Sequence, residues 1–75
     1  MKYVRFRKYN KEYDFACDSY GYGLFYRDER DWGSFRQLLG SCQTPKFKTP
    51  QQFIRWIRRR YHRPGRVVRI SSDWE

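Results

Sequence analysis

Arginine is the residue type whose number and placement in this chain most clearly indicate a chemistry. Twelve of the 17 basic residues are arginine, and the formal net charge is +9. A guanidinium group binds phosphate oxygens through two hydrogen bonds and stacks on flat rings, which a lysine ammonium does less well. From Trp32 to Ile70 the chain has ten basic residues and no acidic one. Because a surface of one sign repels itself, this segment indicates a negatively charged partner.

The main candidate surface is the polar side of a helix predicted over about residues 50–62. The segment Thr49-Pro50-Gln51-Gln52 has the pattern of a capping box, with Thr49 as N-cap and proline at the first helical position. At 100° per residue, one side of this helix is apolar and carries Phe53, Ile54, Trp56, Ile57 and Tyr61. The candidate binding residues on and beyond the other side are Arg55, Arg58, Arg59, Arg63 and Arg66. Arg60 falls among the apolar residues, so it either extends along the edge of the core or contacts a partner.

Two further segments combine aromatic and basic residues. The first is Lys46-Phe47-Lys48, which lies between two prolines. Here the Phe47 ring could stack on a base while the two lysine ammonium groups contact phosphates. The alternative is that Phe47 packs beneath the helix that follows. The second segment is the outer face of a first strand, which alternates Tyr3, Arg5, Arg7 and Tyr9 and resembles the exposed sheets of single-strand binders. Its alternative is that charge on a strand simply opposes aggregation.

Catalytic and metal-binding patterns are missing from the sequence. It has no nucleophile with a base and no glycine-rich phosphate loop, and a chain of 75 residues leaves little room for a large catalytic cavity. Two pairs of aspartates have spacings that suit a divalent cation: Asp14 with Asp18, and Asp28 with Asp31. The alternative is that these carboxylates belong to a turn and to the start of a helix. Cys17, Cys42 and His62 lack the paired spacing of zinc sites. We expect no enzyme, no cofactor and no metal site.

The number of cysteines and the first residues of the chain indicate the cellular compartment of the protein. Two cysteines are too few for a disulfide framework, and residues 1–7 lack the apolar run of a secretion signal. No stretch of 18 apolar residues exists to cross a membrane. We therefore expect an intracellular, cytoplasmic protein with two free thiols.

The strands that position these residues follow from period-two alternation. Val4 and Phe6 alternate with polar residues over about 2–9, Asn10-Lys11 gives a turn, and Tyr13, Phe15 and Cys17 mark a second, antiparallel strand. The acidic side of that strand then lies across from Arg5 and Arg7, where opposite charges pair. After a glycine turn at residues 18–23, a third strand is predicted over about 22–28, in the interior of the sheet.

The remaining elements complete an α+β single domain over residues 1–75. Trp32, Phe35, Leu38 and Leu39 share one helical face, which predicts a short helix over about 32–39 with Asp31 as N-cap and Gly40 as C-cap. A final strand is predicted over 66–70, followed by a flexible tail over 71–75 in which the role of Trp74 is open. The predicted order is β-β-β-α-α-β, with a three- to four-stranded antiparallel sheet covered on one face by one short and one longer helix.

Two functional hypotheses follow from charge and composition. The first is a small nucleic-acid-binding protein, for DNA or RNA, that uses the arginine face of the longer helix with low sequence specificity. The second is a regulator, inhibitor or assembly subunit whose basic surface docks an acidic protein. A membrane surface is a poorer fit because the apolar face of the helix is needed for the core. No sequence signature of a known nucleic-acid-binding family is present.

Overall fold

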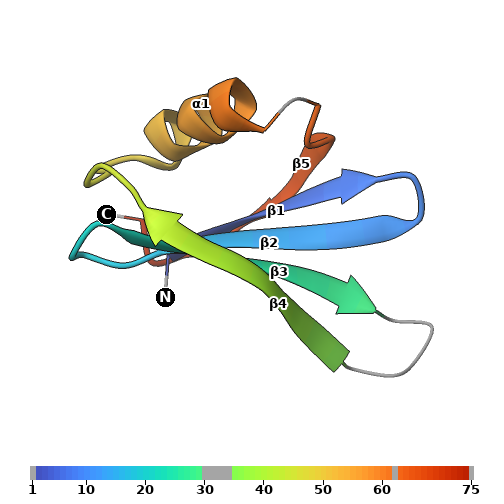
Figure 1. The fold of residues 1–75 in the computed structure, drawn as a ribbon. Coiled ribbons are helices and arrows are strands. Elements are labelled where there is room, and N and C mark those ends of the chain that lie inside the picture. Colours follow the sequence, from blue (N-terminus) through green and yellow to red (C-terminus); the bar gives the residue numbers. More distant parts are fainter. Residues whose placement is uncertain (1, 30–34, 62, 75) are drawn as a thin grey trace.

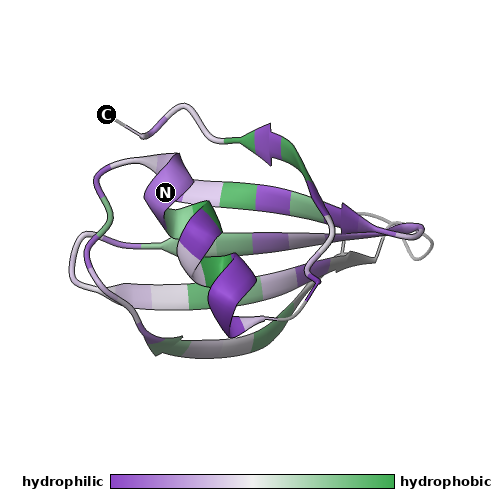
Figure 2. Cartoon of the chain, turned by 90° about the horizontal axis from the view of Figure 1, so that it is seen from above, coloured by the Kyte–Doolittle hydropathy of each residue, from purple (hydrophilic) through white to green (hydrophobic). Residues whose placement is uncertain are grey.

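A five-stranded antiparallel sheet with one helix across it forms the fold of this chain, and the computed structural model describes residues 2–29, 35–61 and 63–74 (Figure 1). The strands follow the order β4-β3-β2-β1-β5 across the sheet. The elements are β1 (Lys2–Lys8), β2 (Lys11–Cys17), β3 (Tyr22–Glu29), β4 (Phe35–Gln43), α1 (Pro50–Arg60) and β5 (Arg66–Ile70). Viewed from above, α1 crosses the strands obliquely and covers one face (Figure 2).

The first three strands form as the alternation of the sequence predicts. β1 and β2 pair from Lys2 opposite Cys17 to Lys8 opposite Lys11. The turn between them has Tyr9 in the left-handed region at φ 57°, so β1 ends one residue earlier than predicted. The next turn is held by Asp18, whose carboxylate accepts hydrogen bonds of 2.9 Å from the backbone N–H groups of Tyr20 and Tyr22. Gly21 supplies the positive φ of 86° that this turn requires.

The predicted short helix over 32–39 is wrong, because residues 35–43 form β4. This strand pairs antiparallel with β3, from Phe35 opposite Glu29 to Gln43 opposite Tyr22. Residues 31–34, including the predicted N-cap, lie outside the described residues. Leu38 pairs with Tyr26 and Gly40 with Phe25, so Leu39 forms a bulge. The bulge breaks the period-two alternation of β4, and its apolar residues therefore have spacings that also suit a helix. Gly40, predicted as a helix cap, lies inside β4.

The predicted α+β class and antiparallel sheet are confirmed, whereas the predicted element order is not. The described chain has one helix in place of two, and the order is β-β-β-β-α-β. The predicted third strand is interior, between β2 and β4, and the predicted final strand is present as β5. β5 pairs antiparallel with β1, from Ile70 opposite Val4 to Arg66 opposite Arg7, so the sheet has five strands and not three or four.

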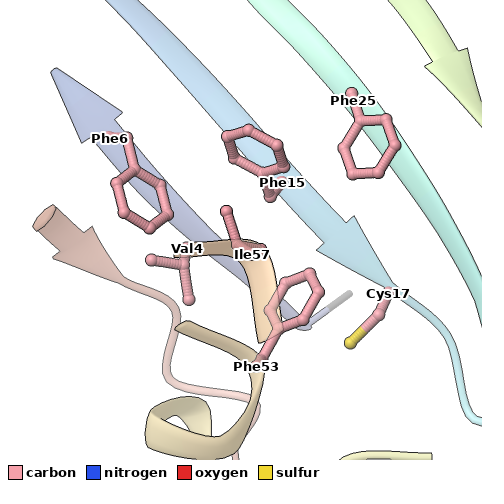
Figure 3. Packing of buried hydrophobic residues seen from close by; sticks show 7 residues of the cluster. All are labelled: Val4, Phe6, Phe15, Cys17, Phe25, Phe53 and Ile57. Atoms are coloured by element: carbon pink, nitrogen blue, oxygen red, sulfur yellow. The ribbon is translucent and has the colours of Figure 1, made fainter. Parts of the chain in front are cut away.

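The core lies between α1 and the face of the sheet that α1 covers. β1 contributes Val4 and Phe6, β2 contributes Phe15 and Cys17, and β3 contributes Phe25, all turned toward Phe53 and Ile57 of the helix (Figure 3). The rings of Phe15 and Phe6 have centroids 5.3 Å apart, and those of Phe15 and Phe25 are 5.0 Å apart, both edge to face. Pairs of this kind add about 0.5–1.5 kcal/mol beyond the burial of their area.

The helix begins at the predicted N-cap Thr49, and Gln52 accepts from the residue before the cap and not from the cap itself, which is a variant of the capping box. Thr49 Oγ1 accepts a hydrogen bond of 3.3 Å from the Gln52 backbone N–H, and Gln52 Oε1 accepts one of 3.0 Å from the Lys48 N–H. The helix ends at Arg60, two residues before the predicted end, and the Tyr61 N–H still donates to the Ile57 carbonyl at 2.7 Å. Among the described residues, no helix has the length and apolar character needed to cross a membrane.

The described part of the segment expected to be a flexible tail lies against β1. The Ser71 N–H donates to the Tyr3 carbonyl at 3.0 Å, and Ser71 Oγ accepts from the Tyr3 N–H at 2.9 Å. Trp74 Nε1 also donates to the Tyr3 carbonyl, at 3.1 Å, and its ring centroid is 5.5 Å from that of Phe53. Trp74 is therefore an anchor that joins the C-terminal segment to the core.

Truncation of Ile57 tests the packing of α1 on the sheet. Ile57 is 0% exposed, so Ile57→Ala leaves a cavity and should lower the free energy of unfolding by about 2–5 kcal/mol. Urea-induced unfolding followed by circular dichroism measures this change. Gln51→Ala, at an exposed position of the same helix, is the control and should change stability by less than about 0.5 kcal/mol. Equal effects of the two substitutions would contradict the packing described here.

Candidate polyanion-binding groove

A groove between α1 and β5 collects three of the arginines that the sequence analysis singled out. Its volume is about 440 Å³. The α1–β5 groove is lined by Gln51, Ile54, Arg55, Arg58, Arg59 and Val67. Arg55 lies three residues before Arg58 and four before Arg59 on one helix, which places its Cβ atom about 5–6 Å from each of theirs. The structure therefore brings Arg55, Arg58 and Arg59 together at one surface.

The charge of the groove is entirely positive and comes from the α1 side. Its lining comes entirely from the stretch between Trp32 and Ile70, which contains no acidic residue. Arg55, Arg58 and Arg59 are exposed, and the ion pairs found within the described residues involve none of them. Ile54 and Val67 are half-buried and add apolar surface between the charges. Such a groove suits a ligand with several negative charges in a row.

The helix itself accounts for part of this charge. Arg58, Arg59 and Arg60 lie in the last turn, where cations interact favourably with the negative end of the helix, by about 0.3–1 kcal/mol each. Arg55 lies earlier in the helix and gains nothing from this effect, which is confined to the last turn. Its place in the helix agrees with the high helix propensity of arginine.

Arg63 and Arg66 lie beyond the helix and do not line the α1–β5 groove. Both are exposed. The chain turns between them at Gly65, whose φ of 102° and close approach to the Arg7 carbonyl leave no room for a Cβ atom. This turn brings Arg66 into register with Arg7 of β1. The two arginines extend the positive surface past the end of the helix.

The loop Lys46-Phe47-Lys48 has its ring turned to the core. The Phe47 ring centroid is 5.1 Å from that of Phe53 and 5.8 Å from that of Trp56. Phe47 is half-buried, whereas both lysines are exposed. The contacts match the alternative in which Phe47 packs beneath the helix. In this loop only the two lysine ammonium groups are therefore open to a partner.

The outer face of β1 is not one continuous binding surface. Arg5 is 8% exposed, and its Nε and Nη2 atoms donate to the two carboxylate oxygens of Asp14 at 2.7 and 3.1 Å. Arg5 Nη1 also lies 3.5 Å from Glu12 Oε2. The hydrogen bond to Asp14 raises the pKa of Arg5 above its ordinary value. The predicted pairing of Arg5 across the two strands is confirmed, and it places this arginine in the structure of the sheet.

The other three residues of that face are held differently. Tyr3 is half-buried, and its backbone is bonded to Ser71. Arg7 is exposed and stands opposite Glu12 in the strand register. Tyr9 leaves the strand for the turn and is 88% exposed. The structure therefore keeps Tyr3, Arg5 and Arg7 on one face of β1, as predicted, but takes Tyr9 out of the strand and holds Arg5 in its pair with Asp14.

The pair of Arg5 and Asp14 gives a prediction about stability. Asp14→Ala leaves a buried guanidinium without its main partner and should lower the free energy of unfolding by about 3–5 kcal/mol. Arg7→Ala removes an exposed arginine from the same strand and should cost less than about 0.5 kcal/mol. Chemical denaturation of both variants measures the difference. A small effect of Asp14→Ala would mean that the pair is not structurally important.

The two cysteines are free and lie too far apart to be joined. They occupy β2 and β4, with Gly23 of β3 in register between Cys17 and Cys42. Two strand spacings separate their Cα atoms by about 9–10 Å, whereas a disulfide needs less than about 7 Å. Within the described ranges, no three His, Cys, Asp or Glu side chains are grouped so that they could hold a metal ion. His62 lies outside those ranges.

Burial of Cys17 predicts a specific pH dependence. Burial is the largest cause that raises the pKa of this thiol from 9.0 to about 11; Asp18 also raises it and Lys2 opposes it. The folded state favours the neutral thiol, so its stabilising contribution is complete below the unfolded pKa and is lost as the pH rises from about 9 to about 11. Cys17→Ala should therefore lose less unfolding free energy over this pH range than the native chain.

The matched control for this measurement is the other cysteine. Cys42→Ala should retain the pH dependence of the native chain, since it keeps the buried thiol of Cys17. Unfolding free energies at several pH values, from denaturant titrations, give both slopes. If Cys17→Ala loses as much stability as the native chain between these pH values, the thiol is not buried as described.

Comparisons with protein-family models, with curated proteins and with solved structures find no match to this chain. Its function is therefore inferred from its own side chains. The charge pattern of the sequence predicts the arginines of the groove but not Val67 of β5, which forms its other side. Val67 could not be predicted from local sequence, because its place in the groove depends on the pairing of β5 with β1.

Proposed function

We propose that this protein binds nucleic acid through the phosphate backbone, with the α1–β5 groove as its main contact. The observation that supports the proposal is the exposure of Arg55, Arg58 and Arg59 side by side in a groove lined only by residues of the acid-free segment. Each guanidinium offers a pair of donors that matches two phosphate oxygens. Successive phosphates of a strand supply the row of negative charges that the groove requires.

Low sequence specificity follows from the kind of contact. Contacts to phosphates fix the position of a protein on a nucleic acid but do not read the bases. If each of the three arginines neutralises one phosphate of a duplex, the logarithm of the affinity should fall against the logarithm of the salt concentration with a slope of about −3. Further contacts by Arg63 or Arg66 would make that slope steeper.

An acidic protein segment is the second candidate partner, and one observation favours it. Ile54 and Val67 give the groove apolar surface, and Val68 and Ile70 of the adjoining edge strand are 41% and 40% exposed. A protein partner would bury these side chains. Because apolar contacts are not screened by salt, a specific protein complex should keep much of its affinity where binding to nucleic acid is lost.

Charge reversal in the groove tests the proposal. The triple variant Arg55→Glu, Arg58→Glu, Arg59→Glu should abolish binding to labelled duplex DNA, single-stranded DNA and RNA, measured by fluorescence anisotropy at two salt concentrations. The corresponding triple glutamine variant should bind weakly, with a salt slope that is smaller by about one for each phosphate contact removed. Circular dichroism verifies that both variants are folded.

The matched control changes the net charge by the same amount at exposed positions outside the groove. It is the triple variant Arg7→Glu, Lys11→Glu, Arg69→Glu. This control should retain most of the affinity of the native chain if the groove is the binding site. Equal loss in both glutamate variants would show attraction by net charge alone, and unchanged binding in the groove variant would exclude the groove.

A further inference from the structure

A second hollow lies beyond the C-terminal end of α1, on the side of the sheet that carries the core. Its volume is about 470 Å³, within the range of about 300–1,000 Å³ that is usual for small-molecule sites. We call it the aromatic cavity, because four of its lining residues are Tyr13, Phe15, Phe25 and Tyr61. None of these residues lines the α1–β5 groove, so the cavity is a separate site.

Three of the four rings of the cavity, Phe15, Phe25 and Tyr61, form one connected cluster. The Tyr61 ring centroid is 5.5 Å from that of Phe15 and 5.0 Å from that of Phe25. Tyr61 is half-buried, and burial raises the pKa of its hydroxyl group. Packing fixes these rings in place, so they present a firm apolar surface to whatever enters the cavity. A flat heterocycle suits such a surface, since stacking on aromatic rings does not depend on which base is present.

Three cations line the same cavity. They are Lys8 at the end of β1, Arg60 at the end of α1 and Arg63 in the connection to β5, and no acidic residue is among the described lining. Arg60 and Arg63 are exposed to solvent at the open side of the cavity, which we call its mouth. Lys8 is half-buried, and its ammonium lies 5.9 Å from the ring centroid of Tyr9. The Arg60 guanidinium lies 5.5 Å from the ring centroid of Trp56 and 6.0 Å from that of Tyr61. These contacts hold in place the one arginine that departs from the helical pattern of the sequence.

A glycine leaves room in the wall of the cavity. Gly40 lies within β4, pairs with Phe25 and has no positive φ that would require glycine. A Cβ atom built at this position would have no heavy atom within 4 Å. Glycine inside a strand costs about 0.5–1 kcal/mol relative to alanine, and it often marks a place that a ligand approaches closely. The space beside Gly40 is therefore open to a ligand.

We infer that the aromatic cavity takes one unpaired nucleotide, with the base against the rings and the phosphate at Lys8, Arg60 and Arg63. The apolar body and the cationic mouth together match a flat heterocycle that carries a phosphate. The inference rests on the proposed function where the nucleotide is part of a bound strand, and it adds a preference for single-stranded over duplex nucleic acid. A free nucleotide has the same chemistry and is the other source.

Filling the cavity from Gly40 is the direct test. Gly40→Ile introduces a side chain into the open space without a strained φ, and isoleucine favours strands. Its affinity for an unstructured RNA oligonucleotide should fall by about tenfold or more, in line with the loss of a stacked base. Its affinity for duplex DNA should not change. Gln43→Ile, at an exposed position of the same strand outside the cavity, is the control and should behave as the native chain.

Mononucleotide binding separates this inference from the proposed function. Adenosine 5′-monophosphate, adenosine and inorganic phosphate are each titrated into the protein while its backbone amide signals are followed by NMR. The monophosphate should shift signals around residues 39–42 and 60–64 in the native chain and not in Gly40→Ile, and adenosine or phosphate alone should bind more weakly. If the native chain does not bind duplex DNA but does bind the monophosphate, the proposed function is overturned and the inference about the aromatic cavity stands.

A second variant keeps the test decisive if Gly40→Ile does not fold. Arg60→Gln removes one cation from the mouth of the cavity and should weaken binding of the monophosphate but not of adenosine. The inference is overturned if the monophosphate does not bind, if it binds equally well to the folded Gly40→Ile or Arg60→Gln variants, or if inorganic phosphate binds as tightly as the nucleotide. It is also overturned if Gly40→Ile retains full affinity for single-stranded RNA.

Discussion

Packing of α1 on the aromatic face of the sheet is the interaction on which the rest of this structure depends. Phe53 and Ile57 are both 0% exposed, and they fix the rotation of the helix about its own axis. Because that rotation is fixed, Arg55, Arg58 and Arg59 must face away from the core. They are displayed on a rigid element, which lowers the entropy lost when they bind a partner. In a chain of 75 residues, one cluster of apolar side chains therefore sets both the stability and the placement of the charge.

Arginine serves two opposite purposes in this protein. Arg5 is buried and held by Asp14 and Glu12, so its charge is neutralised inside the sheet and contributes to the pairing of β1 with β2. The arginines of the α1–β5 groove belong to a stretch without acidic residues and stay exposed to solvent. Net charge alone does not distinguish these uses. The strand register and the location of the carboxylates decide which arginines are open to a partner.

Local patterns in the sequence predicted most of the elements, and non-local contacts account for what was missed. The alternation of Val4 and Phe6, the capping box at Thr49 and the β-branched run of β5 each report on their own segment, and each prediction is confirmed. The segment of β4 was misread because Phe35, Leu38 and Leu39 have helical spacing, and only the bulge and the pairing with β3 make it a strand. The groove needs Val67, and the aromatic cavity needs residues from four strands and the end of the helix, which no single segment reveals.

The central claim is that the surface formed by α1 and β5 meets the phosphate backbone. The most direct measurement is a map of backbone amide NMR shifts as a short duplex DNA is titrated into the native chain at low salt. We expect the largest shifts at residues 51–60 and 66–68, and we expect them to disappear together as salt is added. Large shifts confined to the face of the sheet opposite the helix, or shifts that persist at high salt, would contradict it.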